Sequence, residues 1–243
     1  MEFELRYAQY NSFSILIEWP AIIDKNVLND ILNFKNSIKK NNVKHKAEVI
    51  NTYSSILVIY NLTIDNINDE ILELKTLYKS KNKFQNTHPL IWEIPVCYDD
   101  EFGVDLDSFS KEKKLSKPEI ISCHSEAIYT VYFIGFLPGF LYLGGLDSKL
   151  FLDRKTLPNL NVKKGSVAIG GQQTGIYPQD SPGGWHIIGN SPIELFNANE
   201  NPPCLINVGD KVKFISVDKQ DYLDIQKSVY RFNYQLKSIN TYD

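Results

Sequence analysis

Glycine is distributed very unevenly along the 243-residue chain. Eleven of the 13 glycines lie between Gly135 and Gly189. Glycine is favoured where the backbone takes a positive φ or where another group approaches the main chain closely, and it costs conformational entropy elsewhere. The same segment interleaves aromatic residues, Gln, Thr and Ser with the glycines, a mixture typical of a concave binding surface. We therefore expect the functional site in this segment.

Residues 1–88 contain no glycine and predict a small domain of their own. Alternating or continuous apolar residues predict four strands: Phe3–Tyr7, Phe13–Ile17, Lys46–Ile50 and Ser55–Tyr60. The last is almost wholly apolar, so we expect it in the middle of its sheet. Helical spacing predicts helices over Asp24–Lys40, with Asp24 as the cap, and Ile67–Lys81. This order of elements predicts a ferredoxin-like α+β domain.

The polar stretch Lys79–His88 is expected to link this domain to a second one, residues 89–243. A strand is expected over Ile91–Tyr98, at the edge of its sheet because Pro95 lacks an N–H group. The remaining expected helices are Asp105–Lys114, Ser116–His124, which begins with a Ser116/Glu119 capping box, and Asp218–Tyr230. Further short strands, broken by Gly and Pro, predict an antiparallel barrel: Ile128–Phe136, Ser166–Ile169, Trp185–Ile188 and Val212–Val217.

Composition excludes several classes of function. The net charge is −3 and no basic stripe is present, which argues against a nucleic-acid partner. No apolar run reaches the length of a membrane span, and the charged, alternating N-terminus predicts a strand instead of a signal peptide. The cysteines Cys97, Cys123 and Cys204 are odd in number and widely spaced, and the four histidines form no ligand pair, so we expect neither disulfides nor a metal. A cytoplasmic protein fits best.

Common catalytic motifs are absent. The chain has no phosphate-binding loop G-x-x-x-x-G-K-[ST], no G-x-G-x-x-G and no G-x-S-x-G elbow. Chemistry at the glycine-rich segment must therefore use a less common arrangement, or it must be shared with a partner chain.

Three motifs in this segment resemble one known family. They are Gly135–Leu143 (GFLPGFLYL), Gly165–Pro178 (GSVAIGGQQTGIYP) and Ser181–Gly189 (SPGGWHIIG). In this order they resemble the family of the 5-oxoprolinase B subunit and the kinase A inhibitor, which includes allophanate hydrolase subunit 1 and half of the carboxyltransferase region of urea carboxylase. The resemblance implies an N-terminal ferredoxin-like domain followed by a mainly β, cyclophilin-like barrel.

The resemblance also implies a function. The first candidate is the B subunit of an ATP-dependent 5-oxoprolinase, which works with the A and C subunits to hydrolyse 5-oxoproline to L-glutamate and is inactive alone. ATP is then used by the complex, and this chain need not bind it. Two alternatives stay open: an inhibitor of a sensor histidine kinase, and the carboxyltransferase half of a urea-carboxylase or allophanate-type system.

His124 is the candidate catalytic residue, as an acid–base or substrate-orienting group. The alternative is a histidine that stabilises the C-terminal end of its helix. Residues expected to bind substrate lie on the glycine-rich segment: Phe136, Pro138, Gly139, Phe140, Arg154, Gly170, Gly171, Gln172, Gln173, Thr174, Tyr177, Ser181, Gly183, Gly184 and Trp185.

Gly170–Thr174 is the strongest candidate in this set, because glycines can turn backbone N–H groups toward an anion. The alternative is a β-bulge. Trp185 is interpreted either as a ring that stacks on a ligand or as a core residue packed on glycine backbone. Ser181 has no adjacent base and is expected to begin a turn.

Two arginines that the family commonly carries are replaced here by Asn159 and Asn190, whereas Arg154 remains. If those arginines bind a carboxylate or phosphate, the grip on it is weaker in this chain. Arg154 with Lys163 and Lys164 then compensates, or the choice of substrate has changed. The arginines could instead have served a subunit interface.

Overall fold

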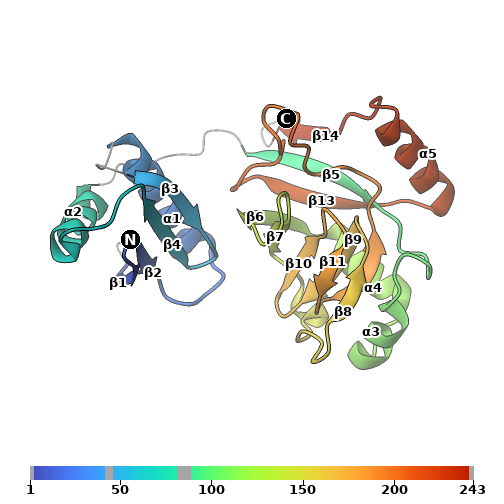
Figure 1. The fold of residues 1–243 in the computed structure, drawn as a ribbon. Coiled ribbons are helices and arrows are strands. Elements are labelled where there is room, and N and C mark those ends of the chain that lie inside the picture. Colours follow the sequence, from blue (N-terminus) through green and yellow to red (C-terminus); the bar gives the residue numbers. More distant parts are fainter. Residues whose placement is uncertain (1–2, 42–45, 81–88, 241–243) are drawn as a thin grey trace. The chain divides into compact units, whose positions relative to one another are not determined.

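The computed structural model describes residues 3–41, 46–80 and 89–240. The chain divides into two compact units, Met1–Thr87 and His88–Asp243 (Figure 1). Each unit has its own hydrophobic core. Most of the expected linker, Lys79–His88, lies outside the described residues.

Unit 1 packs two helices against one face of an antiparallel sheet (Figure 1). Its strands run in the order β1-β2-β4-β3, and alternate residues of β4 are buried, as expected of a sheet covered on one face. β4 has a partner on each side, so its central position is confirmed. The elements are β1 (Arg6–Asn11), β2 (Ser14–Glu18), α1 (Lys25–Lys40), β3 (Lys46–Asn51), β4 (Ser55–Tyr60) and α2 (Ile67–Ser80).

Local signals in unit 1 were predicted well. The Asp24 carboxylate accepts hydrogen bonds from the backbone N–H groups of Asn26 and Val27, so Asp24 caps α1 as expected. The first strand, by contrast, begins at Arg6 and not at Phe3. Deeper in the unit, the Asp30 carboxylate is buried and accepts from Trp19 Nε1 at 2.9 Å and from the Tyr78 hydroxyl at 2.6 Å.

Unit 2 is built on an eight-stranded mixed sheet in the order β12-β9-β10-β7-β6-β13-β5-β14. Two further strands, β8 (Asn159–Val162) and β11 (Ser181–Gly183), form a separate ribbon. The strands of the sheet are β5 (Leu90–Val96), β6 (Ile128–Ile134), β7 (Leu141–Gly144), β9 (Ser166–Gly170), β10 (Gln173–Ile176), β12 (His186–Asn190), β13 (Lys211–Ser216) and β14 (Lys237–Asn240). The helices are α3 (Leu106–Lys113), α4 (Lys117–Glu126), α5 (Lys219–Tyr230) and the single 3₁₀ turn Ser148–Leu150.

The expected antiparallel barrel needs two corrections. β13 and β5 run parallel, and the strand order over the described residues has two ends instead of closing on itself. The sheet still curls strongly, because an antiparallel bridge joins Asn190 at the end of β12 to Cys97 just after β5. Both N–H···O bonds of this bridge measure 2.9 Å. A Cβ on Gly189 would lie 2.8 Å from the Cys97 carbonyl oxygen, so glycine permits the approach.

The expectation that β5 lies at an edge is wrong. β5 pairs with β13 on one side and with β14 on the other. β14 pairs only with Leu90–Glu93, however, so Pro95 lies beyond that partner and needs no N–H for it. Five strands of only three or four residues each were not expected: β7, β8, β10, β11 and β14.

The capping box of α4 is confirmed: the Ser116 side chain accepts from the Glu119 N–H, and the Glu119 carboxylate accepts from the Ser116 N–H. The dipeptide Pro138-Gly139 has the composition that predicts a type II turn. The turn before β7 is of this type, since Phe140 N–H donates to the Leu137 carbonyl and Gly139 has a φ of +81°. Across the described parts of both units, every helix is too short or too polar to cross a membrane.

Candidate functional site

The glycine-rich segment builds one face of the sheet in unit 2. In β9 and β10, Thr174 lies opposite Ile169 and both are buried in the core. Side chains alternate along a strand, so Gly170, Gln173 and Gly175 belong to the other face. The predicted substrate-binding residues of the two strands are therefore divided between the core and this outer face.

An aromatic cluster covers the outer face. Trp185 meets Phe140 and Tyr142 nearly edge-on, with ring centroids 5.6 and 5.9 Å apart, and Phe140 meets Tyr177 at 5.1 Å. Trp185 retains only 4% of its surface exposed. This supports the interpretation of Trp185 as a core residue packed on glycine, and its buried ring does not offer a free face for stacking.

The glycines make room for these rings. A Cβ on Gly170 would lie 2.5 Å from the Trp185 ring, and one on Gly183 would lie 2.2 Å from the Tyr177 hydroxyl oxygen. Gly175 faces the same indole, at 3.1 Å. Close approach of aromatic side chains thus accounts for three glycines of the segment.

Arg154 is exposed and carries its guanidinium over the Trp185 ring, 5.6 Å from the ring centroid. Burial raises the pKa of the Tyr142 phenol, and the Arg154 charge opposes that rise. Burial likewise raises the pKa of the Tyr177 phenol, while a hydrogen bond with the Trp185 backbone and the Arg154 charge oppose it. Arg154, Trp185, Tyr142 and Tyr177 therefore lie together.

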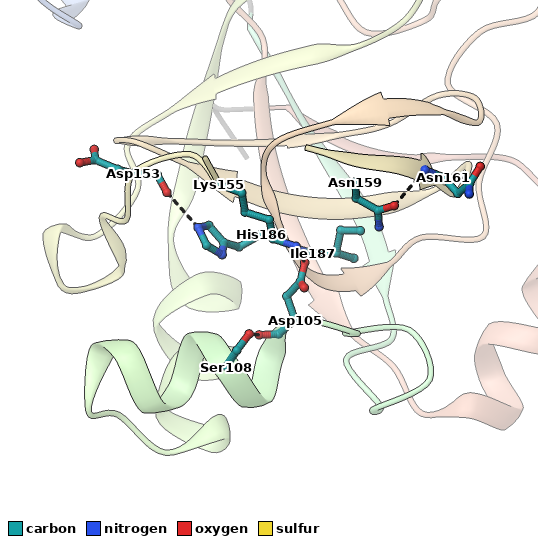
Figure 2. A network of polar contacts seen from close by, with 8 residues as sticks. All are labelled: Asp105, Ser108, Asp153, Lys155, Asn159, Asn161, His186 and Ile187. Carbon is teal, nitrogen blue, oxygen red and sulfur yellow. Dashed lines mark hydrogen bonds and ion pairs between the residues drawn. The ribbon is translucent and has the colours of Figure 1, made fainter. Parts of the chain in front are cut away.

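Beside this group lies a network of polar contacts (Figure 2). Asp105, at the start of α3, points toward the strand that follows Trp185 and accepts from Lys155 Nζ at 2.6 Å and from the Ile187 N–H at 2.7 Å (Figure 2). His186 Nε2 lies 2.8 Å from the Asp153 carbonyl oxygen. Asp105 and Lys155 were not among the predicted site residues, because no local pattern in the sequence links residues so far apart.

Gly170–Thr174 does not form the expected nest of free N–H groups. It is a tight hairpin between β9 and β10 in which Gly170 pairs with Gln173. Gly171 has a φ of +66°, which suits the first position of a type II′ turn, and its N–H donates to the Leu152 carbonyl at 2.7 Å. Gln172 is exposed at the tip of the turn. What the hairpin does offer is the side-chain oxygen of Gln173, which is buried and has no hydrogen-bond partner among the described residues.

His124 is fully buried and takes part in a hydrogen-bonded chain inside the core. The Thr174 hydroxyl donates to the Ala168 carbonyl at 3.0 Å, so Thr174 Oγ1 accepts from His124 Nε2 at 2.9 Å, and Nδ1 accepts from the Tyr98 hydroxyl at 2.8 Å. The ring also stacks on Phe214 at 4.5 Å. Burial lowers the pKa of His124 from 6.5 to about 3.

These contacts argue against the acid–base role expected for His124. A general base must reach the proton that it abstracts, and both ring nitrogens of His124 are engaged beneath the sheet. Neither does the ring stabilise the end of α4, since its partners are Tyr98 and Thr174. Its role in this structure is to join α4 to the sheet.

The replacements of the family's arginines differ in their surroundings. Asn190 is buried, donates to the Lys164 carbonyl at 3.0 Å and accepts from the Tyr222 hydroxyl at 2.9 Å, as a structural residue does. Asn159 lies in β8 and accepts from the Asn161 N–H (Figure 2). Lys163 forms an ion pair with Asp180 at 3.1 Å, and Lys164 forms one with Glu194 at 2.9 Å. These pairs argue against the alternative in which the two lysines assist Arg154.

The remaining predicted residues lie around the aromatic cluster. Phe136, at a φ of +69°, is 65% exposed and packs edge-on against Phe140 at 5.8 Å. Pro138 and Gly139 form the type II turn, and Gly139 packs on Phe196, which lines a separate cavity of about 300 Å³. Ser181 begins the strand β11 opposite Val162, where a turn was expected, and its hydroxyl donates to the carbonyl of Pro182. Gly184 accepts from the Lys155 N–H at 2.7 Å.

The chain is similar to a known protein family and to several of its members. Residues 5–206 match the family described as carboxyltransferase domain, subdomain C and D. The chain is 48% identical to the B subunit of 5-oxoprolinase from Bacillus subtilis over 132 residues, 54% of this chain and 55% of that protein. It is 37% identical to the B subunit of 5-oxoprolinase from Escherichia coli O157:H7 over 174 residues, 70% of this chain and 80% of that protein.

The match to the first of these relatives thus spans about half of that protein's length. In fold, the chain is similar to the K. lactis urea amidolyase with a TM-score of 0.86 at 17% identity, over 99% of this chain and 16% of that one. The family match covers most of the chain and contains the entire glycine-rich segment. The chain therefore belongs to the family of the carboxyltransferase domain, subdomain C and D, together with the 5-oxoprolinase B subunits.

Proposed function

We propose that this chain is the B subunit of an ATP-dependent 5-oxoprolinase, which hydrolyses 5-oxoproline to L-glutamate together with the A and C subunits. One observation carries the proposal. The exposed cation of Arg154 and the buried amide oxygen of Gln173, which has no partner among the described residues, belong to the same outer face of the sheet, beside one aromatic cluster. The relatives that are named as B subunits of 5-oxoprolinase support it.

5-Oxoproline is complementary to such a face. Its carboxylate would pair with the Arg154 guanidinium, which suits planar, bidentate contacts. The side chain of Gln173 is partly exposed, and if it turned outward on binding, its now buried oxygen would accept from the lactam N–H and gain the partner that it lacks among the described residues. The apolar ring of the substrate would lie against the edge of the Trp185 and Tyr142 cluster.

In the net reaction, water adds to the lactam carbonyl carbon, the C–N bond breaks, and the nitrogen leaves as the amine of glutamate. Amide resonance opposes this step, and transfer of the γ-phosphoryl group of ATP to the carbonyl oxygen, with ADP as the leaving group, would overcome it. Breaking of the C–N bond would then leave an acyl phosphate, which a second water would hydrolyse to glutamate and phosphate. This chain would hold and orient the substrate. The base and the nucleotide site would come from partner subunits, since His124 is buried, the Gly171 N–H is occupied and the sequence has no phosphate-binding loop.

The surface of unit 2 supports a role in a larger assembly. Leu157 and Leu160, on and beside β8, are 84% and 74% exposed, and Phe136 is 65% exposed. Side chains of this kind suit contact with another protein. We propose that the partner similar to the 5-oxoprolinase C subunit, which we call the C-like partner, binds here.

We further propose the finer fold assignments. In unit 1, β2, α1, β3, β4 and α2 follow the ferredoxin-like order, with β1 in the place that the last strand occupies in that fold. For unit 2, the curled sheet joined by the Cys97–Asn190 bridge supports a cyclophilin-like barrel that is closed at one point only.

Purification with the A-like and C-like partners from the same cell tests the function. The complex should release glutamate and phosphate from 5-oxoproline and ATP, and no isolated component should do so. An Arg154→Ala complex should lose affinity for 5-oxoproline, whereas a Lys163→Ala complex should match the wild type. A complete complex without turnover would contradict the proposal, and so would activity only with urea and a biotin-carrying protein, or inhibition of a histidine kinase without hydrolysis.

A further inference from the structure

We infer that Asp105 is a positioning residue that holds Arg154 in place through Lys155. The inference rests on the proposed function, because it assigns Arg154 to the substrate carboxylate. Asp105 itself faces Lys155 and the backbone of β12 (Figure 2), so any effect on the substrate must pass through the chain between Asp105 and Arg154.

The short segment 152–155, which we call the strap, carries Arg154. Three of its four residues are held by hydrogen bonds. Leu152 exchanges two backbone bonds with Gly171, at 3.1 and 2.7 Å, and the Asp153 carbonyl oxygen lies 2.8 Å from His186 Nε2. The Lys155 N–H donates to the Gly184 carbonyl at 2.7 Å. The strap is therefore fixed to the turn of one hairpin and to the start of β12.

Arg154 is the exception within the strap. Its guanidinium lies over the Trp185 ring, and it has no hydrogen bond or ion pair to any residue that the structure describes. The direction of the Arg154 side chain thus depends on the backbone of the strap. An unpaired cation in a fixed place is what a carboxylate ligand requires, since the donors need not reorganise when it binds.

The Asp105–Lys155 ion pair is the charged anchor of the strap. The two side chains are only 16% and 24% exposed, respectively, and their N–O distance is 2.6 Å. Asp105 also makes two bonds with the backbone of Ile187: its N–H donates to the Ile187 carbonyl, and its carboxylate accepts from the Ile187 N–H. Loss of the carboxylate charge would leave a largely buried Lys155 cation without its partner, and the strap would shift to hydrate it.

Kinetics of the reconstituted complex tests this. Asp105→Asn keeps the shape and the acceptor for Ile187 but loses the charge, so the KM for 5-oxoproline should rise about tenfold with little change in kcat. Asp224→Asn, which removes a carboxylate paired with Lys227 on α5, is the matched control and should behave as the wild type. In an Arg154→Ala background, Asp105→Asn should add nothing further to KM. Additive effects would overturn the inference.

A second measurement needs no partner and no turnover. The chain has three tryptophans, so fluorotryptophan labelling gives three ¹⁹F signals, which Trp→Phe variants assign. Arg154→Ala should shift the Trp185 signal, and Asp105→Asn and Lys155→Met should shift it in the same direction. A Trp185 signal that both anchor variants leave unchanged would overturn the inference. If the wild-type complex does not hydrolyse 5-oxoproline, the proposed function fails, and the ¹⁹F result still decides whether Asp105 positions Arg154.

Discussion

Gly170 lies directly against the indole of Trp185, so that a Cβ on Gly170 would be 2.5 Å from Nε1 of the ring. The contact places the indole close enough to the sheet for Arg154 to lie over it. Backbone and ring thus share a space that no side chain can enter without displacing one of them.

Gly170→Ala should therefore destabilise unit 2 by about 1–3 kcal/mol, as overpacking does in other cores. Gly184→Ala is the matched control, because a Cβ there would meet only the Lys155 carbonyl oxygen at an ordinary 3.5 Å. Urea unfolding followed by tryptophan fluorescence measures both. Equal midpoints for the two variants would contradict the packing described for Trp185.

His124 should make the stability of unit 2 depend on pH. Above pH 6.5 the imidazole is neutral in both states. Between about pH 6.5 and pH 3, His124 is protonated in the unfolded chain but stays neutral in the folded protein, where it is buried. Protonation therefore favours the unfolded state, and the free energy of unfolding falls as the pH falls. The slope from this group reaches about 1.4 kcal/mol per pH unit.

His124→Gln removes that titration. At pH 7.5 the variant should be less stable than the wild type by about 2 kcal/mol, because Tyr98 and Thr174 lose a buried partner. The difference should narrow steadily as the pH falls toward 4.5, in urea unfolding at a series of pH values. A difference that stays constant across that range would show that His124 is not held neutral.

Replacing Gln173 should make the protein more stable and should weaken its binding of 5-oxoproline. Its side-chain oxygen is buried without a partner among the described residues, so Gln173→Leu should raise the free energy of unfolding by about 1 kcal/mol. The same change should raise the KM of the complex for 5-oxoproline about tenfold, because the lactam N–H loses its acceptor. Gln179→Leu, at an exposed position nearby in sequence, should change neither quantity. A stabilised variant with an unchanged KM would remove Gln173 from the site.

Leu160 should matter to assembly and not to folding. It is 74% exposed in unit 2, so Leu160→Asp should leave the free energy of unfolding within about 0.5 kcal/mol of the wild type. Binding of the C-like partner, measured by calorimetry, should weaken at least about tenfold. Leu62→Asp, at a 57% exposed position of unit 1, is the control. Equal binding by both variants would move the interface elsewhere.

The sequence predicted those features that depend on neighbours in the chain. The Asp24 cap, the Ser116/Glu119 box and the Pro138–Gly139 turn are each decided within four residues, and the structure has all three. Pairing between distant segments was not predictable in the same way. Nothing near Leu90 or Lys211 indicates that these strands run parallel, and a four-residue strand such as β10 is too short to show a period.

The candidate site shows the same limit. The glycine cluster located it on the sheet, but an anion nest and a contact with an aromatic ring both require glycine, and only the structure distinguishes them at Gly170. The same limit applies to His124. Its protonation depends on its burial, and part of that burial comes from Phe214, which is 90 residues away in the sequence. Asp105 and Lys155 are 50 residues apart in the sequence, and no pattern near either residue predicts that they form an ion pair.

The parallel pairing of β5 with β13 also bears on how the protein is made. The strands and helices that the structure describes in unit 1 all lie before residue 81, so this unit can fold while the ribosome is still translating the rest. Unit 2 begins with β5, yet the neighbour of β5 is completed only at Ser216. β5 therefore has neither of its neighbours, β13 and β14, until the end of unit 2 is synthesised, and during that interval its exposed backbone is open to a chaperone or a partner protein.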